Sequence, residues 1–201
     1  MKSKLIAVLV CSMAVGVQAQ VLDLQNGRTA DVMNEPQFSA EAGLVSGDID
    51  YLGVRGNLKV ADNILLMGDI GQADGNETET SAAVSGMMQL PVDLPISVAL
   101  KLGYAMLLSG DTDASDIGLD VIGSAVITDV IGWYVNVGVH RGDIEETYFG
   151  ETYEDDEVLP VVGGGLVFTI NQNASAFVGV DILMGDTFDD TVFGGGVRWG
   201  F

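Results

Sequence analysis

The feature that most constrains the fold of this chain is a strict alternation of side chains that recurs along its length. In the final segment, residues 191–201, Phe193, Trp199 and Phe201 fall on one face. Glycines and Arg198 fall on the other. Successive side chains of a β-strand point to opposite faces, so this pattern predicts a strand with one apolar face and one face of small residues and a charge.

The same alternation predicts ten strands, and eight is the alternative count. In the clearest of them, residues 96–108, every second residue is apolar, and Ser97, Lys101 and small residues stand between. The predicted strands lie at about residues 37–44, 51–60, 64–71, 80–90, 96–108, 117–128, 131–140, 158–170, 174–184 and 191–201.

The chain is both strongly acidic and rich in hydrophobic residues, so the fold must place these two kinds of residue in different regions. The formal net charge is −21, yet 48% of the residues are hydrophobic and the mean hydropathy is +0.35. The acids gather in every second connection, including residues 109–116 and 142–157, whereas the alternate connections are short turns. Such an acidic chain lacks the basic surface that nucleic-acid binding needs.

The N-terminus has the form of a secretory signal. Lys2 and Lys4 precede an apolar run, and small residues end it near Ala19, so residues 1–19 are predicted to be removed. Cys11 lies inside this signal, which leaves the mature chain without cysteine. Residues 20–36 show no periodicity and are expected to form a loose periplasmic extension. No later segment is long and apolar enough to predict a transmembrane helix.

The signal, the alternating segments, the unequal connections and the terminal Phe201 together resemble bacterial outer-membrane β-barrel proteins. The resemblance implies that residues 37–201 form an antiparallel up-and-down transmembrane β-barrel in the cell outer membrane, with an even number of strands. In that class the barrel-insertion machinery recognises the closing strand. The resemblance therefore assigns Phe193, Trp199 and Phe201 to the insertion signal. The implied partners are that machinery and outer-membrane lipids, and a monomer is expected.

A soluble periplasmic β-sandwich or lipocalin-like barrel is the competing interpretation. Its sheets would alternate too, but with the apolar face inward and a water-facing surface rich in Lys, Glu and Thr. Here the polar face consists of Gly, Ala and Ser with a few charges, which is typical of a crowded interior.

Eight ionisable residues fall on the predicted inward face and form a candidate charge network in the lumen. Because the last strand closes on the first, Glu41 is expected to lie between Arg55 and Arg198. We interpret the network as packing that fills a narrow lumen, which favours a structural protein. The alternative is a gate or ion path in a narrow, cation-preferring porin. The network residues are Glu41, Arg55, Lys59, Asp69, Lys101, Asp120, Asp181 and Arg198.

Other chemical signals are weak. Asp111, Asp113 and Asp116 place oxygens at alternate positions, as hard cations such as Ca²⁺ prefer, but they lack the glycine spacing of a calcium loop. His140 ends a predicted strand, and with a distant nucleophile such as Ser109 it suggests a lipid-modifying hydrolase at the outer rim. We therefore assign no catalytic residue, no metal and no cofactor, and expect a protein that is not an enzyme.

Overall fold

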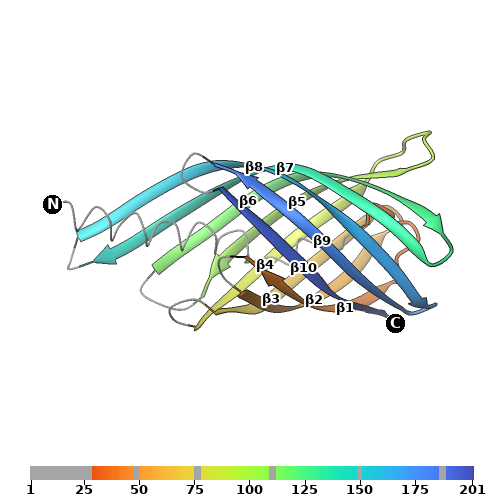
Figure 1. Ribbon diagram of the computed structural model, residues 1–201, viewed down its shortest axis with the longest axis horizontal. Coiled ribbons are helices and arrows are strands. Elements are labelled where there is room, and N and C mark those ends of the chain that lie inside the picture. Colours follow the sequence, from red (N-terminus) through yellow and green to blue (C-terminus); the bar gives the residue numbers. More distant parts are fainter. Residues whose placement is uncertain (1–28, 48–49, 75–77, 109–111, 149–150, 186–188) are drawn as a thin grey trace.

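The computed structural model describes residues 29–47, 50–74, 78–108, 112–148, 151–185 and 189–201, and the predicted signal lies outside them. Ten strands follow one another along this part of the chain (Figure 1). They are β1 (Phe38–Ser46), β2 (Asp50–Ala61), β3 (Ile64–Asp74), β4 (Thr78–Gln89), β5 (Ser97–Leu107), β6 (Thr112–Thr128), β7 (Ile131–Tyr148), β8 (Glu151–Asn171), β9 (Ala174–Met184) and β10 (Asp189–Gly200). Within the described ranges, no helix has the length and apolarity to cross a membrane.

The strands form one closed antiparallel barrel, as the alternation predicts. Each strand pairs with its neighbours in sequence, and β10 pairs with β1 from Ser39 opposite Gly200 onward. Register shifts occur in β2, β6 and β8 close to the short turns that follow these strands. Bulges of this kind are common at barrel rims because they bend the strand and tighten its twist. We call this rim, which also holds the end of β10, the short-turn end.

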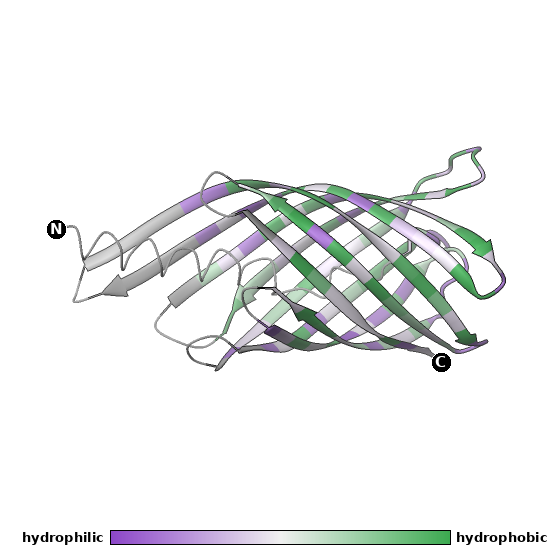
Figure 2. Cartoon of the chain, viewed as in Figure 1, coloured by the Kyte–Doolittle hydropathy of each residue, from purple (hydrophilic) through white to green (hydrophobic). Residues whose placement is uncertain are grey.

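The barrel is apolar outside and polar within. Along β2 the side chains alternate between buried and exposed positions, and Leu52 and Val54 on the exposed face are 64% and 54% accessible. Bands of hydrophobic and hydrophilic residues alternate along the strands in Figure 2. This burial is the reverse of that in a soluble barrel, so the lipocalin-like interpretation is wrong.

Two strands extend much farther than the sequence predicts. Residues 142–157 were expected to be a loop, but β7 runs to Tyr148 and β8 begins at Glu151. Figure 1 shows these two strands projecting beyond the others at the end opposite the C-terminus. An apolar face marks a strand only where it meets lipid, so hydrophobic alternation does not reveal the part of a strand that continues into water.

The interior holds more large side chains than the predicted glycine, alanine and serine face. Leu65, Met87, Leu159 and Leu183 point inward and are at most 2% accessible. Leu65 stands in an unbroken apolar run in β3, where hydrophobicity alone does not tell the two faces apart. The lumen of a small barrel is filled by side chains, and these residues fill much of it.

Candidate functional site

A row of alternating charges lies on the lumen wall across the seam between the last and first strands. Arg198 of β10, Glu41 of β1, Arg55 of β2 and Asp69 of β3 are direct neighbours in the pairing register. Arg198 Nε donates to Glu41 Oε1 at 2.9 Å, and Arg55 Nη1 lies 3.6 Å from Glu41 Oε2. Arg55 Nε donates to Asp69 Oδ1 at 2.6 Å. The structure thus places Glu41 between two arginines, and we call these four residues the central row.

Three of the four side chains of the central row are closed off from water. The side chains of Glu41, Arg55 and Asp69 are each 0% accessible. Asn57 Nδ2 bridges Glu41 Oε1 at 3.1 Å and Ser39 Oγ at 2.9 Å, which adds neutral hydrogen bonds beside the charges. Buried charges are tolerated only where they are paired and hydrogen-bonded, and these contacts supply both conditions.

His140 of β7 lies between two carboxylates of β6 farther around the wall. Its Nδ1 is 3.0 Å from Asp116 Oδ1 and its Nε2 is 3.2 Å from Asp120 Oδ1. A ring that donates from both nitrogens carries a proton on each, so this geometry suits an imidazolium between two ionised acids. The ring lies over Gly118, where an added Cβ would come within 2.3 Å of it. His140 is 2% accessible.

The remaining residues of the predicted network have separate contacts. Asp181 of β9 accepts a hydrogen bond from Asn136 of β7 at 3.1 Å. Lys101 of β5 is buried and lies opposite Asp120 in the register. Lys59 of β2 stands near the short-turn end, where its ammonium donates to backbone carbonyls rather than to an acid of the strands. These contacts thus join the inward charges in local groups around the wall, and a single network through all eight residues stays a prediction.

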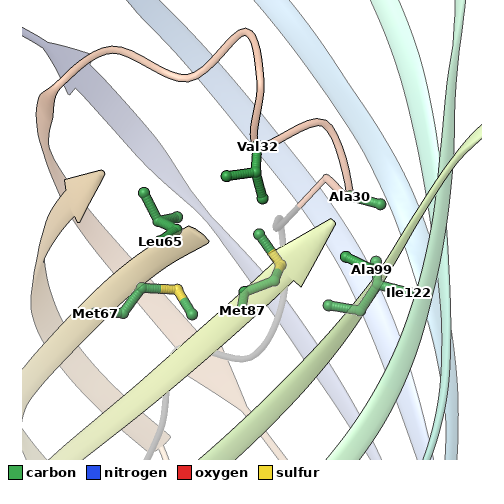
Figure 3. Packing of buried hydrophobic residues seen from close by; sticks show 7 residues of the cluster. All are labelled: Ala30, Val32, Leu65, Met67, Met87, Ala99 and Ile122. Carbon is green, nitrogen blue, oxygen red and sulfur yellow. The ribbon is translucent and has the colours of Figure 1, made fainter. Parts of the chain in front are cut away.

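Residues 29–36 enter the lumen at the short-turn end, and we call them the N-terminal plug. The loose extension expected over residues 20–36 is therefore corrected from Thr29 onward. Ala30 and Val32 are completely buried in a cluster with Leu65 and Met67 of β3, Met87 of β4, Ala99 of β5 and Ile122 of β6. Figure 3 shows Val32 directed toward the side chains of β3 and β4. A segment without periodicity still packs here because the barrel offers an apolar cavity of matching size.

Hydrogen bonds to side chains of β2, β4 and β6 hold the plug in place. The Ala30 amide donates to Ser124 Oγ at 2.8 Å, and the Met33 amide donates to Gln89 Oε1 at 2.9 Å. Lys59 Nζ donates to the carbonyls of Met33 at 2.7 Å and Glu35 at 3.3 Å.

Glu35 connects the plug to the central row. Its Oε1 accepts from Arg198 Nη1 at 2.7 Å, so Arg198 is shared between Glu35 and Glu41. The alternation of apolar and polar residues could not reveal Glu35, because Glu35 precedes the first strand. Asp116, expected in a loop, could be found in retrospect, since it continues the inward face of Gly118 and Asp120.

A cavity of about 630 Å³ lies beside the plug. Asp31, Asn34 and Glu35 line it from the plug, and Arg198 lines it from β10. Hydroxyl and amide side chains of β4, β5, β6, β8 and β9 complete much of the wall, namely Gln89, Ser97, Ser124, Thr128, Thr169 and Ser175. The lining is mixed, because apolar side chains such as Leu94, Val126 and Ile131 share the wall with these polar groups.

On the loop side of the central row, Tyr51 lies flat against glycines of β2 and β3. A Cβ on Gly71 would come within 2.3 Å of the Tyr51 ring, which is itself completely buried. We expect Gly71→Ala to destabilise the barrel by about 1–3 kcal/mol, because the ring has no free space into which to move. Urea unfolding in lipid vesicles measures this loss of stability. Gly68→Ala in the same strand is the matched control, since a Cβ there meets nothing within 4 Å and should change little.

The other predicted site residues lie away from the lumen or outside the described ranges. Phe193, Trp199 and Phe201 face outward and are 61%, 51% and 79% accessible. Asp111 lies outside the described residues, as do the side-chain contacts of Asp113. Asp116 is engaged with His140. Within the described part of the chain, no three His, Cys, Asp or Glu side chains are grouped to hold a metal ion.

Comparisons with known proteins bear on the fold. No protein-family model matches the sequence, and no curated protein matches it significantly. The structure is similar to a KdgM porin in complex with disordered oligogalacturonate, with a TM-score of 0.50 and 13% identity over 81% of this chain and 99% of that chain. It is also similar to the N-terminal β-barrel domain of Pseudomonas aeruginosa OprF, with a TM-score of 0.45 and 14% identity over 83% of this chain and 98% of that chain. For LpxR from Salmonella typhimurium the TM-score is 0.46, with 14% identity over 88% of this chain and 78% of that chain.

The class follows from the architecture. Ten antiparallel strands closed into a barrel, with apolar residues toward the outside and charged residues toward the axis, define an outer-membrane β-barrel protein. The likeness to the KdgM porin agrees with this fold. The protein therefore has the fold of the small outer-membrane barrels, and its apolar exterior is suited to a lipid bilayer.

Proposed function

We propose that this protein is a structural outer-membrane β-barrel whose lumen is filled by its own side chains and does not conduct solutes. The observation that carries the proposal is the buried central row together with the seated N-terminal plug. The row occupies the wall at the closing seam, where the side chains of Glu41, Arg55 and Asp69 are 0% accessible. Toward the short-turn end, Ala30 and Val32 of the plug are buried against side chains of β3 to β6. Outer-membrane lipids and the barrel-insertion machinery are the partners that this function requires.

Single-channel recording tests the proposal. The mature chain, expressed from Gln20 and folded in planar bilayers, is expected to show no discrete conductance steps above the baseline. A heat-modifiable shift on gels serves as the control that the reconstituted chain is folded. Steps with a reversal potential that favours cations would contradict the proposal and support the second candidate.

That second candidate is a narrow cation-preferring pore, favoured by the cavity at the short-turn end. Asp31 and Glu35 lie in its wall, and acidic entrances raise the local concentration of cations. The central row then forms the constriction of such a pore. This function requires a path past Arg198 and Glu41, whose side chains are 10% and 0% accessible.

A lipid-modifying hydrolase receives the least support. A general base must reach the proton that it removes, whereas His140 is buried and each of its ring nitrogens already faces an aspartate. The described contacts of His140 include no serine. Its arrangement supports a role in packing the wall between β6 and β7.

A further inference from the structure

We propose that the N-terminal plug is a gate that leaves and re-enters the short-turn end of the lumen, and that the Glu35–Arg198 ion pair holds it closed. This proposal rests on the proposed function, because a gate has meaning only in a lumen that is closed while the plug is seated. It concerns residues 29–36 alone and the groups that contact them.

The barrel is complete without the plug. None of residues 29–36 belongs to a strand, and the ladder between β1 and β10 closes from Ser39 onward. Arg198 also donates to Glu41 at 2.9 Å through Nε, a hydrogen bond that does not involve Glu35, so we expect the central row to persist when Glu35 is withdrawn. Departure of the plug therefore breaks no strand pairing and leaves no buried arginine without a carboxylate.

The polar contacts of the plug are ones that water can replace. Ser124 and Gln89 accept from its amides, and Lys59 donates to its carbonyls. All three side chains lie at the short-turn end, and Ser124 and Gln89 line the cavity of about 630 Å³ into which the segment could move. Only Ala30, Val32 and Glu35 are buried, whereas Met33 and Asn34 are exposed.

The C-terminal end of the plug is fixed to the barrel at Pro36 and Gln37. Pro36 packs against Gly200, where an added Cβ would lie 2.8 Å from the proline ring. The Gln37 carbonyl accepts from the Lys59 amide at 3.0 Å, which fixes the chain immediately before β1. Pro36 is therefore the pivot of the proposed movement, and Glu35, the residue beside it, forms the ion pair between the plug and Arg198 of the barrel.

Cysteine accessibility tests the gate. The mature chain has no cysteine of its own, so Val32→Cys introduces a single thiol in the buried face of the plug. We expect a membrane-impermeant maleimide to modify this thiol slowly in the folded barrel, and about ten-fold faster when Glu35→Gln removes the charged hydrogen bond to Arg198. Ala105→Cys is the matched control, since it is buried in the lumen without touching the plug and its rate should not change.

Two results would overturn the gate. An unchanged rate at Val32→Cys in the Glu35→Gln background would mean that the plug is a permanent part of the interior. Equal acceleration at Val32→Cys and Ala105→Cys would mean that the whole barrel has loosened. Should Glu35→Gln fail to fold, Lys59→Met, which removes the bonds to Met33 and Glu35, provides the same comparison. Conductance by the unmodified chain would instead refute the proposed function, so the two failures have different readouts.

Discussion

Glu41→Ala is expected to lower the free energy of unfolding by about 3–5 kcal/mol, a large share of the stability of a small barrel. Removing this carboxylate leaves Arg55 and Arg198 adjacent on the lumen wall with no negative charge between them. It also takes away one of the acceptors of Asn57 Nδ2, which keeps its bond to Ser39. Because the side chains of Glu41 and Arg55 are 0% accessible, water cannot replace the lost contacts. Urea unfolding in lipid vesicles measures the loss, and the heat-modifiable gel shift should occur at a lower temperature.

Two further variants separate the effect of the Glu41 charge on stability from the effects of its side-chain volume and of its burial. Glu41→Gln keeps the shape of the side chain and should recover only part of the stability, because the amide is neutral. Asp143→Ala removes one of the carboxylates paired with Arg141, in an ion pair whose side chains are 55% and 52% accessible, and should cost less than about 1 kcal/mol. Similar losses at Glu41 and Asp143 would show that the central row contributes no more than an exposed pair.

Val54→Arg is expected to destabilise the folded barrel in lipid by about 2–4 kcal/mol, because it places a cation on the outer face midway along β2. Val54 is 54% accessible in the isolated barrel, and in the outer membrane its neighbours are acyl chains. Urea unfolding in lipid vesicles again measures the loss of stability.

Val60→Arg is the matched control for this prediction. Val60 lies on the same face of the same strand and is 50% accessible, but it stands beside the turn to β3. Arginine there reaches the headgroups, and the expected loss is only about 0–1 kcal/mol. Equal effects at the two valines would mean that the outer face does not meet a hydrocarbon core with a defined depth.

Much of the fold could be predicted from local pattern. The period of two in residues 96–108 and 191–201 places each side chain on a face, because strand geometry allows only two directions. The count of ten strands follows from these segments and their turns. The position of Glu41 between Arg55 and Arg198 follows once the last strand closes on the first.

The site was predictable only where a charge interrupts an otherwise small-residue face. Arg55 and Asp120 stand out in this way. Asp116 was placed in a loop because the apolar signal ends at Ile117, although β6 continues to Thr112. Leu65 and Met87 were hidden because both faces of their strands carry apolar residues.

The sequence by itself determined that this chain closes into a barrel with its apolar side chains toward lipid, since that outcome depends on alternation within each strand and on backbone groups that only a closed sheet can satisfy in a bilayer. Only the tertiary structure decided what fills the lumen. The N-terminal plug has no periodicity, and its Val32 and Glu35 find their partners in β3, β4 and β10, far away in sequence. Such contacts depend on the size and charge of a cavity that does not exist until all ten strands have closed around it.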